Sequence, residues 1–393
     1  MITKHDFNPQ CITYSQMNMI FNARIYYRRL TTWTIAYIIS RYTGVGTSEE
    51  LFGRLYLESI DIGNMMQIIF GRDVSDRYSQ MVSQFPIAFR DLLSAQLEGD
   101  TESINQYVDQ LYRNVGERAA FLEAINPYWT ESGYRDLFGT YIQYTIEIAN
   151  AFASGDYSKY IETYDRLTEH TNKMGDTFAQ GLYDYITSGQ QTTDYLPLQE
   201  SDQCITIDQM NTIFNIRMFW FELATWTRSY MLSRYRGLGN TEAVFARLKQ
   251  VPVDYTNTIK QIFGEEVAAG LLQELNTYLE LLDEFITAQL EGDIDEIDRI
   301  TKLLYENADK RAALISSVNP FWTFEEWRNR LYNNLRDTLN QSTTFLMGDY
   351  ARNIDIYSRI LDLAENTSSY FAQGLFQYFN SIDPKPESQE GIS

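Results

Sequence analysis

The chain has 393 residues, of which 44% are hydrophobic and 22% charged, and its formal net charge is −21. This composition is typical of a folded globular protein, and the length accommodates two domains that each bury their own core. The negative charge argues against a nucleic-acid-binding function, because phosphates are bound through Lys and Arg. We therefore expect no nucleic-acid partner, which leaves an unidentified protein partner or self-association.

The ends and the cysteines bear on where the protein works. The first residues, "MITKHDFNPQ", lack the basic start and apolar run of a secretory signal. The longest uncharged apolar stretch, from Leu30 to Ser40, is far shorter than the ~20 residues of a membrane-spanning helix. We therefore expect a soluble, cytoplasmic protein without an integral membrane segment. Cys11 and Cys204 are too few for a disulfide framework or a CxxC metal site, which predicts free thiols in a reducing compartment.

The sequence contains an internal repeat. Residues 11–187 align with residues 204–380 at a constant offset of 193 without a gap, and about a third of the aligned positions are identical. Matched words include "CIT", "TWT", "AQLEGD" and "FAQGL". We interpret this as a tandem duplication. Residues 1–10 are then an N-terminal extension, 188–203 a polar linker and 381–393 a disordered tail.

Within each copy the apolar residues recur every three or four positions, which predicts amphipathic helices. Runs that alternate between apolar and polar residues are missing, so a sheet is not expected. The predicted fold is all-α, with two tandem antiparallel helical bundles. The helices expected in the first copy are 15–41, two short helices within 48–70, 73–98, 101–125, 131–154 and 157–187.

Short repeated words mark the expected helix ends. The word "EGD" at 98–100 predicts a glycine stop and then an Asp cap for the next helix. The "NP" at 126–127 ends the following helix, because the residue before proline is pushed out of the α region. Thr130 is placed to cap the next helix, and the same words recur 193 residues later. There, Glu296 and Glu326 are placed to complete capping boxes.

Motifs for catalysis or metal binding are missing from the sequence. A di-iron bundle needs Glu-x-x-His pairs, but the only histidines are His5 and His170, and position 167 is leucine. The second copy has Leu363 in place of His170, which we interpret as an ordinary helix residue. No GxxxxGK[ST] phosphate loop is present, and "TGVG" at 43–46 is interpreted as a helix stop. We therefore predict no catalytic residue, metal or cofactor.

Polar residues on the apolar stripes form the candidate site. Arg118 and Arg311 lie on these stripes, with Asn114 and Asn307 one turn earlier. A buried guanidinium without a partner is costly, so we expect carboxylate partners on the segment 48–70 and its counterpart. We interpret the set as a network that ties these segments to the bundles, or alternatively as an anion- or carboxylate-binding pocket between helices. The set comprises Asp61, Asn64, Asn114, Arg118, Asp254, Asn257, Asn307 and Arg311.

Aromatic residues are frequent, with 29 tyrosines and 22 phenylalanines. Rings at helical spacing are typical of a core, with tyrosine hydroxyls reaching the surface. An alternative is that surface tyrosines serve assembly or crosslinking, as in coats and shells. The tryptophans that recur in both copies, and that we assign to the core, are Trp33, Trp129, Trp226 and Trp322.

Several words together resemble a family of uncharacterised helical-bundle proteins from spore-forming and related bacteria, which often carry an acetylglutamate kinase label. These words are "NAD" at 307–309, "AAFL" at 119–122, "INPYW" at 125–129 and "MGD" at 174–176. The family is typically one unit long, so this chain resembles a fused double version, although the first copy lacks "NAD". The resemblance implies histidines at inward positions, but here these hold Leu30 and Leu223, Phe85 and Tyr278, and Tyr141 and Asn334.

These observations favour a non-enzymatic structural or binding protein built from two bundles. The resemblance adds an expected association with the spore or forespore. The competing hypothesis is a small-ligand- or anion-binding bundle, or an enzyme, that uses a pocket between helices in each copy. The absence of a phosphate-binding loop gives the kinase label no support from the residues.

Overall fold

The structure is a computed structural model that describes residues 11–188, 203–238 and 241–382. Over these residues the chain is all-α, with twelve helices and two short strands. The predicted N-terminal extension lies outside the described residues, as do most of the predicted linker and tail. Among the described helices, none combines the length and the apolar character that crossing a membrane requires.

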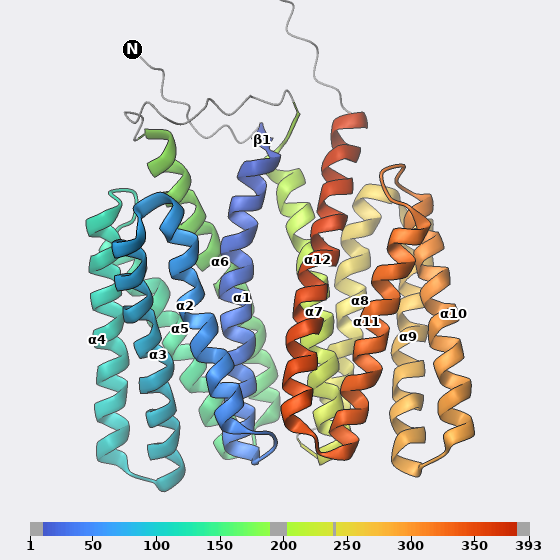
Figure 1. Cartoon of the computed structure of the whole chain (residues 1–393), viewed down its shortest axis with the longest axis horizontal. Coiled ribbons are helices and arrows are strands. Elements are labelled where there is room, and N and C mark those ends of the chain that lie inside the picture. Colours follow the sequence, from blue (N-terminus) through green and yellow to red (C-terminus); the bar gives the residue numbers. More distant parts are fainter. Residues whose placement is uncertain (1–10, 189–202, 239–240, 383–393) are drawn as a thin grey trace, which may run out of the picture.

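The helices form two bundles that lie side by side in Figure 1. Each helix of the second bundle begins 193 residues after its counterpart in the first, which is the offset of the sequence repeat. The first bundle comprises α1 (Tyr14–Thr43), α2 (Ser48–Phe70), α3 (Arg72–Glu98), α4 (Thr101–Ile125), α5 (Glu131–Ser154) and α6 (Tyr157–Ser188). The second comprises α7 (Ile207–Arg236), α8 (Thr241–Phe263), α9 (Glu265–Glu291), α10 (Ile294–Ser317), α11 (Phe324–Met347) and α12 (Tyr350–Ile382).

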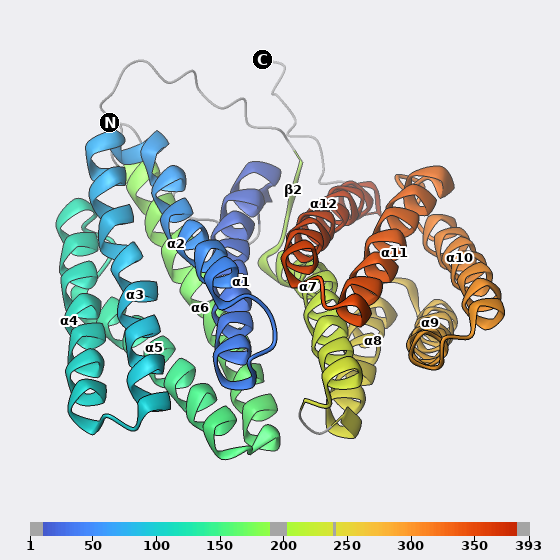
Figure 2. The same cartoon turned by 60° about the horizontal axis from the view of Figure 1, so that its bottom comes forward.

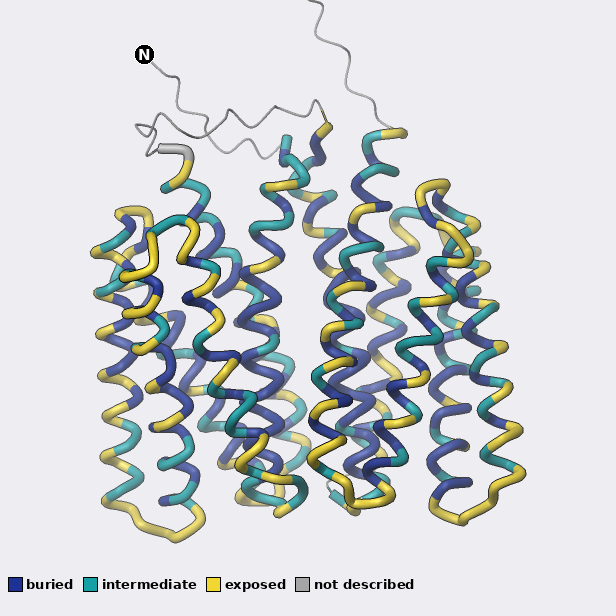
Figure 3. The backbone as a smooth tube through the Cα atoms, viewed as in Figure 1, coloured by how far each residue is buried: buried dark blue, intermediate teal, exposed yellow. Residues whose placement is uncertain are grey.

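Helices α1 and α7 lie at the centre of the molecule, where they contact each other and the other bundle. Most of their residues are buried, on all sides of each helix (Figure 3). A helix buried all round has no need of a polar face, which explains the uncharged stretch from Leu30 to Ser40. The core also contains Trp33, Trp129, Trp226 and Trp322, which are all buried as predicted.

The helix ends follow the predicted punctuation. Gly99 ends α3 in the left-handed conformation with φ 71°, and Thr130 caps α5 by accepting a hydrogen bond from Gly133 N. The two predicted capping boxes are only half formed. Asp293 and Thr323 accept the backbone hydrogen bonds as expected, but the carboxylates of Glu296 and Glu326 pair instead with Arg299 and Arg330.

The segment 48–70 is one continuous helix, α2, and the prediction of two short helices is wrong. Gly63 lies in the middle of α2 where α3 passes close by. A Cβ on Gly63 would lie 1.8 Å from Ser79 Oγ, and Ser75 Oγ donates a 2.7 Å hydrogen bond to the Gly63 carbonyl. Glycine here therefore permits close helix packing, and it does not interrupt the helix.

The words "NPYW" and "FAQGL" are packed against each other. Asn126 Nδ2 donates to the Gly181 carbonyl at 2.9 Å, and the Trp129 ring stacks on Phe178 with centroids 4.8 Å apart. A Cβ on Gly181 would lie 1.9 Å from Trp129 Nε1, so a larger residue cannot occupy this position without movement of the ring. The turn between α4 and α5 is thereby fixed onto α6. The second bundle has the same arrangement with Asn319, Trp322 and Gly374.

Substitution of Gly181 by alanine tests this packing. We expect Gly181→Ala to lower the free energy of unfolding by about 1–3 kcal/mol, because the buried tryptophan must move to admit the methyl group. Gly53→Ala is the matched control, since a Cβ on Gly53 meets nothing within 4 Å. It should leave stability unchanged or raise it by about 0.5–1 kcal/mol. Equal effects of the two variants in urea unfolding would contradict the packing argument.

Candidate functional site

The structure separates the predicted polar network into a buried part and an exposed part. Asn114, Arg118, Asn307 and Arg311 are buried. Their predicted partners are exposed on the outer faces of α2 and α8, so the predicted pairing of Asp61 with Arg118 is wrong. The reason is the helical phase of α2, which turns Ile62 and Met66 inward. The exposed residues are Asp61, which accepts a hydrogen bond from Asn64, and Asp254 and Asn257.

The buried asparagines join neighbouring helices within each bundle. Asn114 Nδ2 donates to the Met81 carbonyl at 2.8 Å, which links α4 to α3. Asn307 Nδ2 donates at 2.9 Å to both the carbonyl and the carboxylate of Glu274, which links α10 to α9. Such bonds satisfy helix backbone groups and fix the relative position of the two helices. The network therefore stabilises the α3–α4 and α9–α10 pairs, not the attachment of α2 and α8.

The two buried arginines lie against aromatic rings. The guanidinium carbon of Arg118 lies 4.3 Å from the centre of the Phe138 ring, and that of Arg311 lies 4.6 Å from the centre of the Tyr278 ring. Such cation–π contacts partly replace the solvation that a buried charge loses. Burial nevertheless lowers the pKa of Arg311, although the nearby Tyr278 and Glu274 act in the opposite direction.

A small cavity lies in each bundle, and the two overlap in position. The volume is about 10 Å³ in each bundle, which is room for about one water molecule. Neither cavity is large enough for an organic ligand, which typically occupies several hundred Å³. Both are lined by the positions at which the resemblance implies histidines, namely Leu30, Phe85 and Tyr141 in the first bundle and Leu223, Tyr278 and Asn334 in the second.

The two bundles meet at a contact surface that we call the seam. The seam is formed by β1 (Ile12–Thr13), α1, α2 and α6 on one side and by β2 (Cys204–Ile205), α7, α8 and α12 on the other. Strands β1 and β2 pair antiparallel, with Ile12 opposite Ile205. Since 205 is 12 plus 193, corresponding positions of the two copies meet at the centre of this pair.

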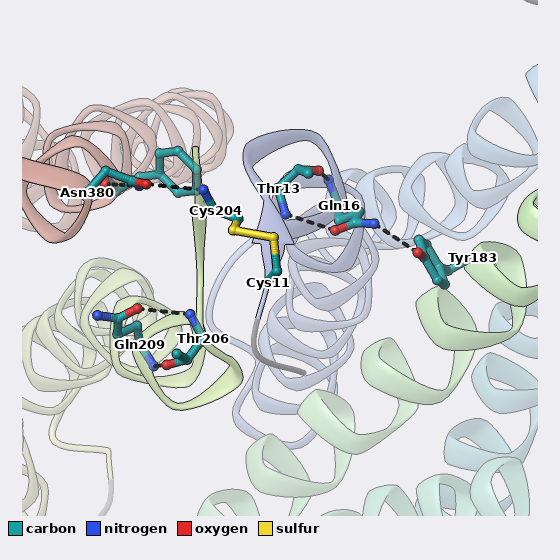
Figure 4. The surroundings of a disulfide bond; sticks show 9 residues. Cys11, Thr13, Gln16, Tyr183, Cys204, Thr206, Gln209 and Asn380 are labelled. Carbon is teal, nitrogen blue, oxygen red and sulfur yellow. Dashed lines mark hydrogen bonds between the residues drawn. A yellow bond between two sulfur atoms is a disulfide. The ribbon is translucent and has the colours of Figure 1, made fainter. Parts of the chain in front are cut away.

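Cys11 and Cys204 form a disulfide across the seam, so the prediction of free thiols is wrong. Their Cα atoms are 5.0 Å apart, a normal separation for a disulfide. Figure 4 shows hydrogen bonds that hold the strand pair beside the disulfide to both bundles. Gln16 Nε2 donates to the Tyr183 hydroxyl at 2.9 Å, and Cys204 N donates to Asn380 Oδ1 at 3.1 Å.

Below the disulfide, the same pairing of corresponding residues continues. The Phe21 and Phe214 rings meet edge to face with centroids 3.7 Å apart. Arg24 lies over the Phe214 ring at 3.8 Å, and Arg217 lies over the Phe21 ring at 3.7 Å. Further along, Trp33 contacts Tyr357 at 5.4 Å, and their counterparts Trp226 and Tyr164 contact each other at 5.5 Å. The seam therefore has the pattern of a two-fold symmetric dimer interface, in which one surface patch contacts its own copy.

Sequence reasoning missed the seam, although one signal was available. In a symmetric interface, residues near the axis lie opposite their own counterparts. Cys11 and Cys204 occupy corresponding positions in the repeat and are the only cysteines. They were therefore candidates for a bond on such an axis. The interpretation as free thiols rests on their small number and makes no use of their equivalence.

An ion cluster joins α2 to α12 through α1. Arg29 Nε donates to Glu58 at 3.0 Å, and its Nη1 donates to Asp362 at 2.7 Å and contacts Glu365 at 3.5 Å. Glu58 is 7% exposed. Burial raises the pKa of Glu58 to about 7, although Arg29 acts in the opposite direction. Three carboxylates thus share one guanidinium, and the buried one is protonated in part at neutral pH.

Metal ligands do not gather in the part of the chain that the structure describes, where no group of three His, Cys, Asp or Glu residues is placed to hold an ion. His170 is half-buried, its Nε2 lies 2.8 Å from the Leu137 carbonyl, and burial lowers its pKa. No family model matches this chain, and neither a curated protein nor a solved structure matches it.

The pKa of Glu58 predicts a pH dependence of stability. Its value is about 7 in the folded chain and 4.5 in the unfolded chain, so between these values the folded state keeps a proton that the unfolded state has lost. The free energy of unfolding should therefore fall as pH rises from about 4.5 to 7, by about 3 kcal/mol from this group. Glu58→Gln should remove this part of the slope.

Urea unfolding of both proteins at pH 5, 6, 7 and 8 measures the difference. Glu117→Gln, at an exposed position on α4, is the control and should run parallel to the unsubstituted protein. If the Glu58→Gln profile also runs parallel to it, Glu58 does not titrate in this window and the argument from burial fails.

Proposed function

We propose that the protein is a non-enzymatic structural or binding protein whose working unit is the pair of bundles joined at the seam. The proposal rests on the contacts of the buried polar side chains and on the size of the cavities. Buried arginines and asparagines are engaged with rings and helix backbones, and each cavity holds about 10 Å³. The buried polar side chains therefore hold helices together, and the cavity at the predicted site is too small for an organic ligand.

The proposed binding takes place on the outer surface, with a protein partner or a second copy of the chain. The formal net charge of −21 favours a partner with basic groups. Crosslinking through surface tyrosines has little support. Among the residues that the structure describes, only Tyr112 and Tyr128 are exposed, at 43% and 41%.

The disulfide is relevant to the compartment in which the protein functions. Disulfides persist mainly in oxidising surroundings and are rare where thiols are kept reduced. We therefore propose that the joined form acts in an oxidising environment and not in the reducing cytoplasm that the cysteine count suggests. Association with the spore follows only from the family resemblance and remains part of this proposal.

Loss of the disulfide should weaken the unit without unfolding each bundle. Because Cys11 and Cys204 close a loop of 193 residues, Cys11→Ser with Cys204→Ser should lower the free energy of unfolding by about 2–5 kcal/mol. Thermal unfolding with and without dithiothreitol measures this. Reductant should shift the transition of the unsubstituted protein and leave that of the double variant in place. No shift in the unsubstituted protein would contradict a disulfide that constrains the fold.

Native mass spectrometry of the protein purified from its source tests the proposed function. We expect a full-length chain carrying one disulfide, alone, as a multimer or with a protein partner. A stoichiometric metal ion, organic cofactor or small metabolite retained by the chain would contradict the proposal. The same sample can be reduced mildly, exchanged into fresh buffer and measured again. Partners that depend on the joined unit should then be lost, whereas partners of a single bundle should remain bound.

A further inference from the structure

The cavity of the first bundle has properties of a binding site for a very small guest. It lies between α1, α2, α3, α4, α5 and α6, and Arg118 is on its wall. The side chain of Arg118 is buried, with 7% of the residue exposed, and its Nε has no hydrogen-bond partner among the described residues. A buried N–H group without an acceptor costs about 1–3 kcal/mol, and more when it is charged.

A second donor without a partner lies on the same wall. Tyr27 is 3% exposed, lines the cavity, and its hydroxyl has no partner among the described residues. Burial raises the pKa of Tyr27 well above its usual value, so the hydroxyl keeps its proton and remains a donor. Of the other tyrosines on the wall, Tyr26 donates to the Ser59 carbonyl and Tyr141 pairs with Thr34.

The charge of the cavity is not balanced by the protein. The wall contains the guanidinium of Arg118 and four tyrosines but no carboxylate, and Arg118 forms no ion pair with a described residue. The Phe138 ring covers one side of the guanidinium, at 4.3 Å, but a ring does not supply a full negative charge. A buried cation is stable when an anion accompanies it.

We propose that the cavity of the first bundle binds one monatomic anion, a halide such as chloride, between Arg118 Nε and the Tyr27 hydroxyl. A volume of about 10 Å³ admits a single atom and excludes phosphate, sulfate and carboxylates. A water molecule fits the space but leaves the charge unbalanced. The proposal is independent of the structural or binding function, because every lining residue of the site belongs to the first bundle.

The second bundle provides the natural control. Its cavity has no arginine on its wall and is lined instead by neutral side chains that include Asn334 and Gln341. Arg311 has the charge of Glu274 nearby, whereas the position of Glu274 in the first bundle is occupied by Met81. The balance that Glu274 gives to Arg311 is therefore missing around Arg118, so the halide is expected in the first bundle only.

Diffraction from crystals grown in sodium bromide tests the proposal on the unsubstituted chain. Data collected at the bromine absorption edge should show an anomalous peak in the first cavity and none in the second. Density in the first cavity without an anomalous signal would mean that a water molecule occupies the site. An empty cavity would show that nothing binds there. Either result overturns it.

A solution experiment measures the affinity and the residues responsible. At constant ionic strength, replacing sodium gluconate by sodium chloride should raise the thermal unfolding midpoint, and sodium sulfate should not reproduce the rise. Tyr27→Phe should weaken the apparent chloride affinity about tenfold or more, because a hydrogen bond to a charged group is lost. Arg118→Met should abolish the chloride response.

Two variants with matched changes serve as controls. Tyr134→Phe removes a buried hydroxyl that also lacks a partner but is not on the cavity wall, and Arg311→Met removes the corresponding arginine of the second bundle. Both should keep the chloride response. Loss of the response in these controls, or its persistence in Tyr27→Phe at full affinity, would contradict the proposed site.

Discussion

The structure depends on one constraint, which is that two corresponding surfaces meet face to face at the seam. Phe21 and Phe214 contact each other directly, each with an arginine of the other bundle over its ring, and the disulfide closes one end of the contact. This contact requires α1 and α7 to be buried on all sides, since each packs within its own bundle and against the other. It therefore decides which helices are central and which face solvent.

Buried positive charge is stabilised by aromatic rings and by carboxylates, because Arg24 also pairs with Asp176 and Arg28 pairs with Glu222. Arg24, Arg118, Arg217 and Arg311 are buried, and each guanidinium lies within 5 Å of a ring centre. Such contacts suit an interior rich in aromatic residues, because the rings both fill space and attract cations. The carboxylates that give the chain its net charge remain largely on the surface. Glu58 and Asp337 are buried, with 7% and 3% of each residue exposed, and burial raises the pKa of Glu58 to about 7.

Features written in local sequence were predictable, and features that need two distant segments were not. Helix ends followed from glycine, proline and threonine at Gly99, Pro127 and Thr130, because these residues act on their own backbone. The single helix α2 was not predictable, because the reason for a glycine at position 63 is the close approach of α3, a distant segment, and not a break in the helix. The inward orientation of Arg118 followed from its place on the apolar stripe. Its surroundings did not, because Asp61 lies one residue away from the inward-facing Ile62, and helical phase over a short segment is easily misjudged.

The central claim is that the seam makes the two bundles one cooperative unit. Differential scanning calorimetry of the oxidised full chain tests it most directly, because it compares the heat absorbed with the sharpness of the transition. The account predicts one transition in which the calorimetric and van't Hoff enthalpies agree. Two resolved transitions, or a van't Hoff enthalpy of about half the calorimetric value, would show that the bundles unfold independently and would contradict the account.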